Sequence, residues 1–415
     1  MNLTSGLWRH SDFVKLWAGQ TVSLYGSLIT RIALPFTAIL VLNATPFQIA
    51  WLRIADLLPG FLVGLVAGVW VDRLRRRPLM IVADLGRALL LGSIPVAAFL
   101  HHLGIGQIYL VAFLAGMLTI VFDVAYLAYL PSLLRPEELV EGNSKLAASG
   151  SVAEVSAFGL AGWLVQIFTG PVAVLIDACS FLFSAASVAL IRREEPALPP
   201  TGERQSLRVE IVEGLRFILS NRPLRAAAAG LICLELSYSF SGAVYLLFVT
   251  RGLGFRPGVL GLIFAVGGVS SLAGALLAQW SIRRLGSGPA MICGLLLAGL
   301  GSLFVPLAHG ATLVAVVLLV AQQLVADGGA TVFVIGEQSL RQTLAPNRLL
   351  GRVNASIRFT SLGLSMVGLL LSGLLGETIG LRLTLVVGAG VMFFGALLLL
   401  LSPLRRLKEP LAVSS

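Results

Sequence analysis

Long apolar stretches alternate with short polar turns along almost the whole chain. The apolar stretches are continuous, without the polar–apolar alternation of a barrel strand, and a helix needs about 20 such residues to cross about 30 Å of hydrocarbon. Only helices and closed barrels can span a membrane, because backbone polar groups find no water there. The pattern predicts an all-α integral membrane protein with twelve transmembrane helices. The predicted spans are 14–42, 48–71, 79–100, 107–131, 144–168, 171–191, 224–249, 257–282, 289–308, 312–340, 353–376 and 381–402.

Positive charges are distributed unequally between the two sets of turns. The turns after the odd-numbered spans carry only Arg251, Arg256 and Arg382, whereas most other Lys and Arg residues lie in the remaining turns and near the termini. Such an excess marks the cytoplasmic side. We therefore expect a multi-pass protein of the cell inner (cytoplasmic) membrane with both termini in the cytoplasm. The net charge of +10 is explained by this topology, so no nucleic-acid partner is expected.

One long polar segment, residues 192–223, divides the spans into two sets of six. Its first part is rich in proline and reads as a linker. Its second part places Leu207, Ile211, Leu215 and Ile218 at helical spacing. This pattern predicts an amphipathic helix, lying either on the cytoplasmic membrane surface or packed under the bundle. The predicted domains are thus bundles 1–191 and 224–415, the latter ending in a short cytoplasmic tail.

The two halves of the sequence match when one is shifted by 211 positions. Parallel repeats related by an axis along the membrane normal are one plan of transporter folds, with the substrate site between the halves. We therefore expect pseudo-two-fold symmetry between the bundles. The matching pairs are Pro46 with Pro257, Arg73 with Arg284, Asn143 with Asn354, and Gly162 with Gly373.

The stretch Gly64–Pro78, GLVAGVWVDRLRRRP, resembles the loop signature of the major facilitator superfamily. The stretches FVKLWAGQTVSLYGS, FDVAYLAYLPSLLRPEEL and LLGRVNASIRFTSLGLSMVGLLLSG resemble its drug- and siderophore-exporter branch, which includes the enterobactin exporter and macrolide efflux proteins. The resemblance implies a twelve-helix transporter that rocks between inward- and outward-open states and usually exports against inward proton flow. It also implies a cytoplasmic gate loop formed by Gly68, Asp72, Arg73 and Arg77.

The sequence departs from the branch at two positions. Ser27 follows Gly26 in the first span where members often carry Asp, and Phe158 stands where antiporters often have the proline of a Gly-Pro motif. The resemblance therefore locates neither the proton-carrying acid nor the direction of transport.

Polar residues at helical spacing form a stripe on spans one, four, seven and ten, the spans that the superfamily places around its central cavity. Charged side chains in mid-bilayer cost ~2.5–3.5 kcal/mol and usually face a cavity or a partner; for the hydroxyl and amide groups, interhelical hydrogen bonding is the alternative. The stripes are Gln20, Ser23, Ser27 and Arg31; Thr119, Asp123 and Tyr126; Glu235, Tyr238, Gly242 and Tyr245; and Gln323, Asp327 and Thr331.

These stripes suggest how protons are coupled to transport. Arg31 would face Glu235 or Asp327 across the cavity, and a movable Arg–acid pair makes proton affinity depend on conformation. Asp123 and Glu154 are further candidates, Asp123 alternatively as part of an intracellular gate.

Two other acids are expected to be structural. Asp177 is expected near the outer surface, and Glu337 is four residues from Arg341, the spacing of an ordinary ion pair on one helix.

Aromatic residues would make the cavity amphipathic and suited to a bulky, partly apolar compound. The predicted substrate contacts are Gln20, Ser27, Tyr126, Tyr238, Tyr245 and Gln323. No GxxxxGK[ST] phosphate loop is present, so energy is expected from an ion gradient, with a proton gradient favoured, or from the substrate's own gradient. No cofactor or metal is expected.

The sequence predicts a secondary active exporter of an amphipathic small molecule, acting as a monomer in the lipid bilayer. A lipid or lysolipid translocator of the same fold is the alternative. A membrane-embedded enzyme is not expected, because the four histidines lie outside the span cores, and a sensor would have no soluble domain to report a signal.

Overall fold

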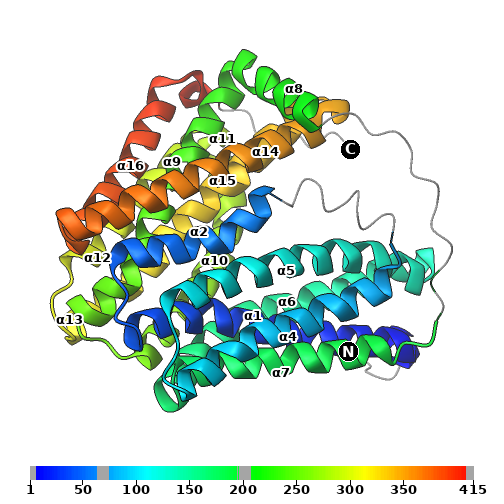
Figure 1. The fold of residues 1–415 in the computed structure, drawn as a ribbon. Helices are drawn as coiled ribbons and strands as arrows, with labels where there is room; N and C mark the ends of the chain where they lie inside the picture. Colours follow the sequence, from blue (N-terminus) through cyan, green and yellow to red (C-terminus); the bar gives the residue numbers. More distant parts are fainter. Residues whose placement is uncertain (1–5, 63–73, 194, 196–206, 408–415) are drawn as a thin grey trace. The chain divides into compact units, whose positions relative to one another are not determined.

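The computed structural model describes residues 6–62, 74–193, 195 and 207–407 (Figure 1). Regular secondary structure in this part of the chain is helical. Eleven of its helices are long and apolar enough to cross a membrane. The predicted all-α membrane class is therefore confirmed.

Each predicted span of the first half has a helix. The second predicted span runs to residue 71, and its part beyond Leu62 lies outside the described residues. The helices are α1 Ser11–Leu40, α2 Pro46–Leu62, α4 Arg76–Phe99, α5 Ile105–Leu133, α6 Leu139–Phe168 and α7 Gly170–Ala189, with short 3-10 turns η1 Gly6–Arg9 and η2 Pro136–Glu138.

The second half has a helix for each predicted span and, before them, the amphipathic helix. The ninth span is formed by two helical pieces and the tenth by three, the middle one a π turn. The elements are α8 Leu207–Ser220, α9 Arg222–Leu247, η3 Phe248–Gly252, α10 Pro257–Leu285, α11 Ser287–Ser302, α12 Phe304–Leu307, α13 Leu313–Gln322, η4 Gln323–Asp327, α14 Gly328–Leu344, α15 Asn347–Thr378, α16 Leu381–Leu401 and η5 Pro403–Arg406.

Side-chain caps fix the first turns of several helices, because the first amide groups of a helix have no partner within it. His10 Nδ1 accepts a hydrogen bond from the Phe13 amide at the start of α1. Asn221 Oδ1 accepts one from the Leu224 amide at the start of α9. These caps place the helix starts close to the positions where the apolar stretches begin.

The chain forms two compact units. The first comprises residues 1–44, 54–203 and 257–262, and the second comprises residues 45–53, 204–256 and 263–415. Unlike the predicted bundles, the units exchange two helix starts: the start of α2 belongs to the second unit, and the start of α10 belongs to the first.

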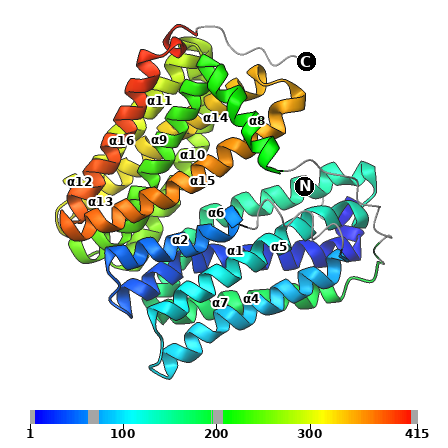
Figure 2. The same cartoon turned by 45° about the horizontal axis from the view of Figure 1, so that its top comes forward.

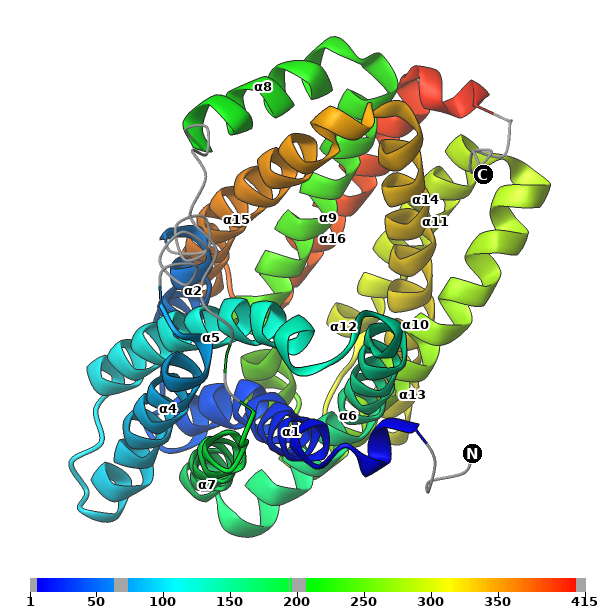
Figure 3. The same cartoon turned by 90° about the vertical axis from the view of Figure 1, so that its right-hand side faces the viewer.

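In the first unit, α7 packs along α1 and α4, while α5 packs on α4 and α6 on α1 (Figure 3). A core of fully buried side chains, including Phe13, Phe122 and Tyr129, lies among these helices. In the second unit, α9 packs on α15 and α16, and α11 packs on α14 and α16. Phe333 and Met392 are completely buried in its core.

The amphipathic helix α8 packs against α15 and α9 (Figure 2). Ser356 Oγ on α15 donates a hydrogen bond to the Ile211 carbonyl at 2.8 Å, and Glu213 forms an ion pair with Arg352. Gly214 lies so close to α15 that an added Cβ would overlap its backbone. Of the two alternatives for this helix, the structure therefore supports packing under the bundle.

The 211-residue repeat is visible in the backbone. The turn from α6 to α7 passes through Thr169 at φ 84°, and the turn from α15 to α16 passes through Gly380, its repeat counterpart, at φ 86°. Both residues have nearly the same ψ, 160° and 159°. The two halves thus use one turn geometry at equivalent positions.

The repeat also governs two close helix contacts. On α6, Gly162 lies against α10, where an added Cβ would come within 2.8 Å of the Gly261 Cα. Its counterpart Gly373 on α15 lies against α2, where an added Cβ would come within 2.8 Å of the Ala50 Cβ. Each contact lies within one compact unit, and small residues on both sides allow the close approach.

Candidate functional site

A pocket of about 260 Å³ in the second unit contains Glu235, one of the predicted cavity acids. Its walls come from α9, α14 and α15, and combine apolar side chains with charges of both signs. The lining residues are Leu231, Glu235, Arg341, Asn354, Ile357, Arg358, Ser361, Leu362 and Ser365.

Arg341 enters this pocket from α14 while paired with Glu337, at 3.4 Å between Arg341 Nη2 and Glu337 Oε2. This confirms the predicted pair at a spacing of four. Glu337 is 2% exposed, so the charges of Glu337 and Arg341 neutralise each other within this pair. Glu235 and Arg358 are then the pocket charges available to a bound molecule.

Arg358 and Asn354 were missed as site residues by sequence reasoning. They lie one turn apart on α15, a spacing that puts them on one helix face. The signal available was therefore a polar stripe on the eleventh span, in addition to those on the first, fourth, seventh and tenth.

Gln323 and Asp327 lie together, as predicted, but not on a regular α-helix. They bound the π turn η4, in which hydrogen bonds run from i to i+5 and one residue is added to the turn. Both side chains lie against Gly267 of α10, where an added Cβ would be 2.8 Å from Asp327 Oδ2. The spacing of four therefore identified the neighbours while missing the bulge, a feature often found at functional sites.

The two predicted tyrosines of α9 differ in their surroundings. Tyr238 is 39% exposed. Tyr245 packs against Phe264 of α10 at 5.8 Å between ring centroids. The buried Tyr245 hydroxyl has no hydrogen-bond partner among the described residues, so it is available to a water or a ligand.

The predicted residues of the first unit lie on three helices. Arg31, Asp123 and Glu154 are exposed, while Gln20 and Ser27 are half-buried. Tyr126 is half-buried as well and stacks on Phe122 at 6.2 Å. The pairing of Arg31 with Glu235 or Asp327 stays a prediction.

A buried charged cluster in the first unit was not predicted as a site. It consists of Asp84 and Arg87 on α4 with Asp177 on α7, and is called the Arg87 cluster below. The three residues are 0%, 3% and 1% exposed, respectively. Asp177, expected near the outer surface, lies in the middle third of α7. The available signal was the acid–arginine pair at a spacing of three inside an apolar span.

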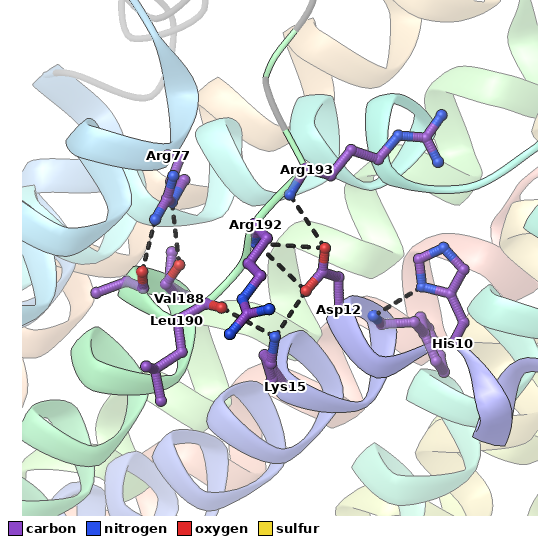
Figure 4. A network of polar contacts seen from close by, with 10 residues as sticks. His10, Asp12, Lys15, Arg77, Val188, Leu190, Arg192 and Arg193 are labelled. Atoms are coloured by element: carbon purple, nitrogen blue, oxygen red, sulfur yellow. Dashed lines mark hydrogen bonds and ion pairs between the residues drawn. The ribbon is translucent and has the colours of Figure 1, made fainter.

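Only part of the predicted gate loop lies within the described residues. Gly68, Asp72 and Arg73 lie outside the described residues. Arg77 is described, and its guanidinium donates hydrogen bonds to the Val188 and Ala189 carbonyls at 3.2 and 2.5 Å (Figure 4). A cation on the last carbonyls of a helix is favourable, so Arg77 holds the end of α7 against the start of α4.

Two acids complete this end of the first unit. The Asp12 carboxylate accepts hydrogen bonds from Lys15 Nζ at 2.8 Å and from the Arg192 and Arg193 amides (Figure 4). Glu195 Oε2 accepts a hydrogen bond from the Arg76 amide at 2.8 Å, and this bond caps the start of α4. The start of the segment predicted as a linker is therefore fixed to the ends of α1, α4 and α7.

Among the described residues, no group of three or more His, Cys, Asp or Glu side chains is placed to hold a metal ion.

Comparison with known proteins identifies the family. The model of the family described as "Major Facilitator Superfamily" matches residues 16–365 and 227–414. The multidrug efflux pump Tap of Mycolicibacterium fortuitum is 25% identical over 410 residues, covering 95% of each chain. Macrolide efflux protein A of Streptococcus pyogenes is 27% identical over 219 residues, covering 52% of this chain and 53% of that protein.

The fold is also similar to that of solved structures. A bacterial homologue of the iron transporter ferroportin in its inward-facing state superposes with a TM-score of 0.76 over 95% of this chain and 99% of that chain. The two sequences are 18% identical, so this similarity concerns the fold alone.

Proposed function

Because this chain belongs to the major facilitator superfamily and is a multi-pass membrane transporter, we propose that it exports a bulky amphipathic small molecule in exchange for protons. Both termini then lie in the cytoplasm, as the charge distribution predicts. The transporter works as a monomer and uses no cofactor.

The observation that carries the substrate class is the pocket around Glu235. Apolar walls formed by Leu231, Ile357 and Leu362 suit a hydrophobic body, while Glu235 and Arg358 offer one charge of each sign. Pockets that combine apolar walls with placed polar groups hold the hydrophobic part of a ligand and fix its orientation.

The efflux relatives support export of such compounds. Tap is named as a multidrug efflux pump and resembles this chain over 95% of its length. Macrolide efflux protein A, named for a class of antibiotic, resembles about half of it. These names favour drug-like amphipathic substrates and the outward direction.

The test is an accumulation assay in cells that express the chain, using a panel of dyes, macrolides and a fluorescent lysolipid. We expect one or more amphipathic compounds to accumulate less than in cells without the chain. A protonophore should restore their accumulation, because it collapses the proton gradient. If only the lysolipid is moved, lipid translocation replaces drug export as the function. If the accumulation of every compound is unchanged, both functions are contradicted.

A pocket variant links the assay to the structure. Glu235→Gln keeps the size of the side chain and removes its charge. We expect this variant to export cationic members of the panel poorly and neutral members normally, since hydrogen bonds to a charged group contribute about 1.5–3 kcal/mol. Equal loss for both kinds of compound would indicate damage to the fold, to be checked by thermal unfolding of the purified variant.

A further inference from the structure

We propose that the Arg87 cluster is a proton-binding site in which the carboxyl groups of Asp84 and Asp177 hold one proton between them. This site rests on the proposed proton exchange and assigns its proton to named groups in the first unit.

The cluster is built around the guanidinium of Arg87. Arg87 forms a hydrogen-bonded ion pair with Asp84, three residues earlier on α4. Its Nη1 lies 3.4 Å from Thr119 Oγ1 on α5. The rings of Phe122 and Phe181 lie 4.4 and 4.1 Å from its central carbon, so apolar surface surrounds the charge.

Asp177 reaches the same region from α7. Ser180 Oγ lies 3.1 Å from Asp177 Oδ1, and Thr30 of α1 is another neighbour of this carboxyl. Arg87 interacts electrostatically with Asp177 as well as with its direct partner Asp84. Arg87 is therefore the ion-pair partner of Asp84 and a nearby positive charge for Asp177, and both carboxyl groups are no more than 1% exposed.

The number of charges favours one bound proton. With both carboxyls ionised, the three buried groups would carry a net charge of −1 in a region of low dielectric, where an uncompensated charge is costly. The carboxylate of Asp123, which also interacts with Arg87, is exposed and lies outside this count. With one proton shared by the two carboxyls, the cluster is neutral. Groups coupled in this way titrate as a pair, so the proton belongs to both acids rather than to one.

Two buried oxygen atoms show where the proton or a water is accommodated. Asp84 Oδ2 and Ser184 Oγ are buried neighbours, and no hydrogen bond of good geometry joins either of them to a residue that the structure describes. Asp84 is 0% exposed and its other oxygen, Oδ1, is the one paired with Arg87. An unpaired buried oxygen of this kind is costly unless a proton or a water satisfies it.

The groups facing the cluster can be named from each packed helix. The α5 helix contributes the carboxylate of Asp123, which is exposed and also interacts electrostatically with Arg87. The α1 and α7 helices contribute hydroxyls, those of Thr30, Ser180 and Ser184. Asp123 is thus an exposed carboxylate close enough to interact with Arg87.

Release of the proton breaks one carboxyl O–H bond; the electron pair stays on the carboxylate and the proton passes to water. The cluster then carries its extra negative charge beside Gly26 of α1, where an added Cβ would overlap Asp177 Oδ1 and Ser180 Oγ. Because α1 and α7 touch so closely here, a conformation that admits water favours release, and a dry one favours the neutral cluster.

The test uses the full-length protein, purified in detergent and reconstituted in liposomes, and the variant Asp177→Asn. The amide keeps the size of the carboxyl and can still accept the Ser180 hydrogen bond. Asp84 and Arg87 then balance each other without a proton. We expect the carboxylic-acid C=O band in acid-minus-alkaline infrared difference spectra to lose the signal of this cluster.

The same variant is expected to uncouple transport. With an imposed gradient of about one pH unit, one proton per cycle supports about tenfold accumulation, and Asp177→Asn should reduce this to the level seen with a protonophore. Exchange of labelled for unlabelled substrate, which needs no net proton movement, should persist. Asp84→Asn should give the same infrared loss, because it also leaves one acid for one guanidinium.

The control is Glu337→Gln, which removes another buried acid that is paired with an arginine; the band must survive it. Retention of the band in both aspartate variants would overturn the proton site. If the wild-type band is lost on substitution but no pH gradient drives transport in the wild type, the proton site stands and the proposed exchange fails.

Discussion

At the scale of single residues, Thr169 has a backbone conformation that side chains other than glycine rarely adopt. Its φ of 84° and ψ of 160° lie in a region that is essentially restricted to glycine and costs about 1–3 kcal/mol for other residues. Its repeat counterpart Gly380 has almost the same angles without that cost. The strain belongs to one half of the molecule only, although the turn is shared by both.

We predict that Thr169→Gly raises the thermal unfolding midpoint of the purified protein. The gain in free energy of unfolding should be about 1 kcal/mol, the relief of strain less the extra freedom of glycine in the unfolded chain. The reciprocal variant Gly380→Thr should lower the midpoint. A lower midpoint for Thr169→Gly would show that the threonine side chain contributes contacts worth more than the strain.

At this scale the sequence indicated some residues of the candidate sites and not others, for a physical reason. Glu235 was identified because a charge among polar neighbours at helical spacing stands out in an apolar span. Asp84 and Arg87 were not identified, because an acid and an arginine three residues apart can form an ion pair with each other on one helix. Only the packing of α7 on α4 reveals that Asp177 makes a second acid for the same arginine.

At the scale of elements, the starts of α2 and α10 are capped by side chains at repeat-related positions. Glu377 Oε1 on α15 accepts a hydrogen bond from the Phe47 amide at 3.3 Å. Gln166 Oε1 on α6 accepts one from the Gly258 amide at 2.9 Å. The two acceptors are 211 residues apart, as are the two donors, but only one acceptor can carry a negative charge.

We predict that Glu377→Gln loosens the first turn of α2. A negative charge at a helix N-terminus contributes about 0.3–1 kcal/mol, so the amide of Phe47 should exchange with deuterium faster in the variant. The reciprocal change Gln166→Glu should slow exchange at Gly258. Equal exchange in wild type and both variants would show that the hydrogen bond, and not the charge, holds these turns.

The helices themselves were largely predictable, because apolar length alone determines where the chain can span a lipid layer. The pattern did not show where the hydrogen bonding within a span departs from that of a regular α-helix. The π turns η3 and η4 arise where packing shifts the hydrogen-bond register, which leaves no signature in apolar length. The position of α8 also needed the structure, because an amphipathic face fits a membrane surface and a helix bundle equally well.

At the scale of the whole molecule, the proposals assign different tasks to the two units. The pocket around Glu235 lies in the second unit, and the Arg87 cluster lies in the first. Substrate recognition and proton binding would then be performed by separate groups, coupled through the conformational change of the transporter. This differs from the sequence-based expectation, in which Arg31 and an acid of the other half, Glu235 or Asp327, couple protons to transport.

This separation predicts complementary phenotypes. Glu235→Gln should change which compounds are exported while the pH dependence of export of neutral compounds stays as in the wild type. Asp177→Asn should abolish the pH dependence while the order of preference among compounds is kept. Transport of the full panel at several external pH values measures both the compound preference and the pH dependence. A loss of pH dependence in Glu235→Gln would show that Glu235, in the second unit, takes part in proton binding.

The sharing of helix starts has a consequence for biosynthesis. Residues 45–53 belong to the second unit but are made before nearly all of it, and residues 257–262 belong to the first unit but are made after it. At about 5–20 residues per second, the start of α2 waits roughly 8–30 s for the rest of its unit to begin emerging from the ribosome. Neither unit can be completed while the other is unmade, so the two must mature in the membrane together.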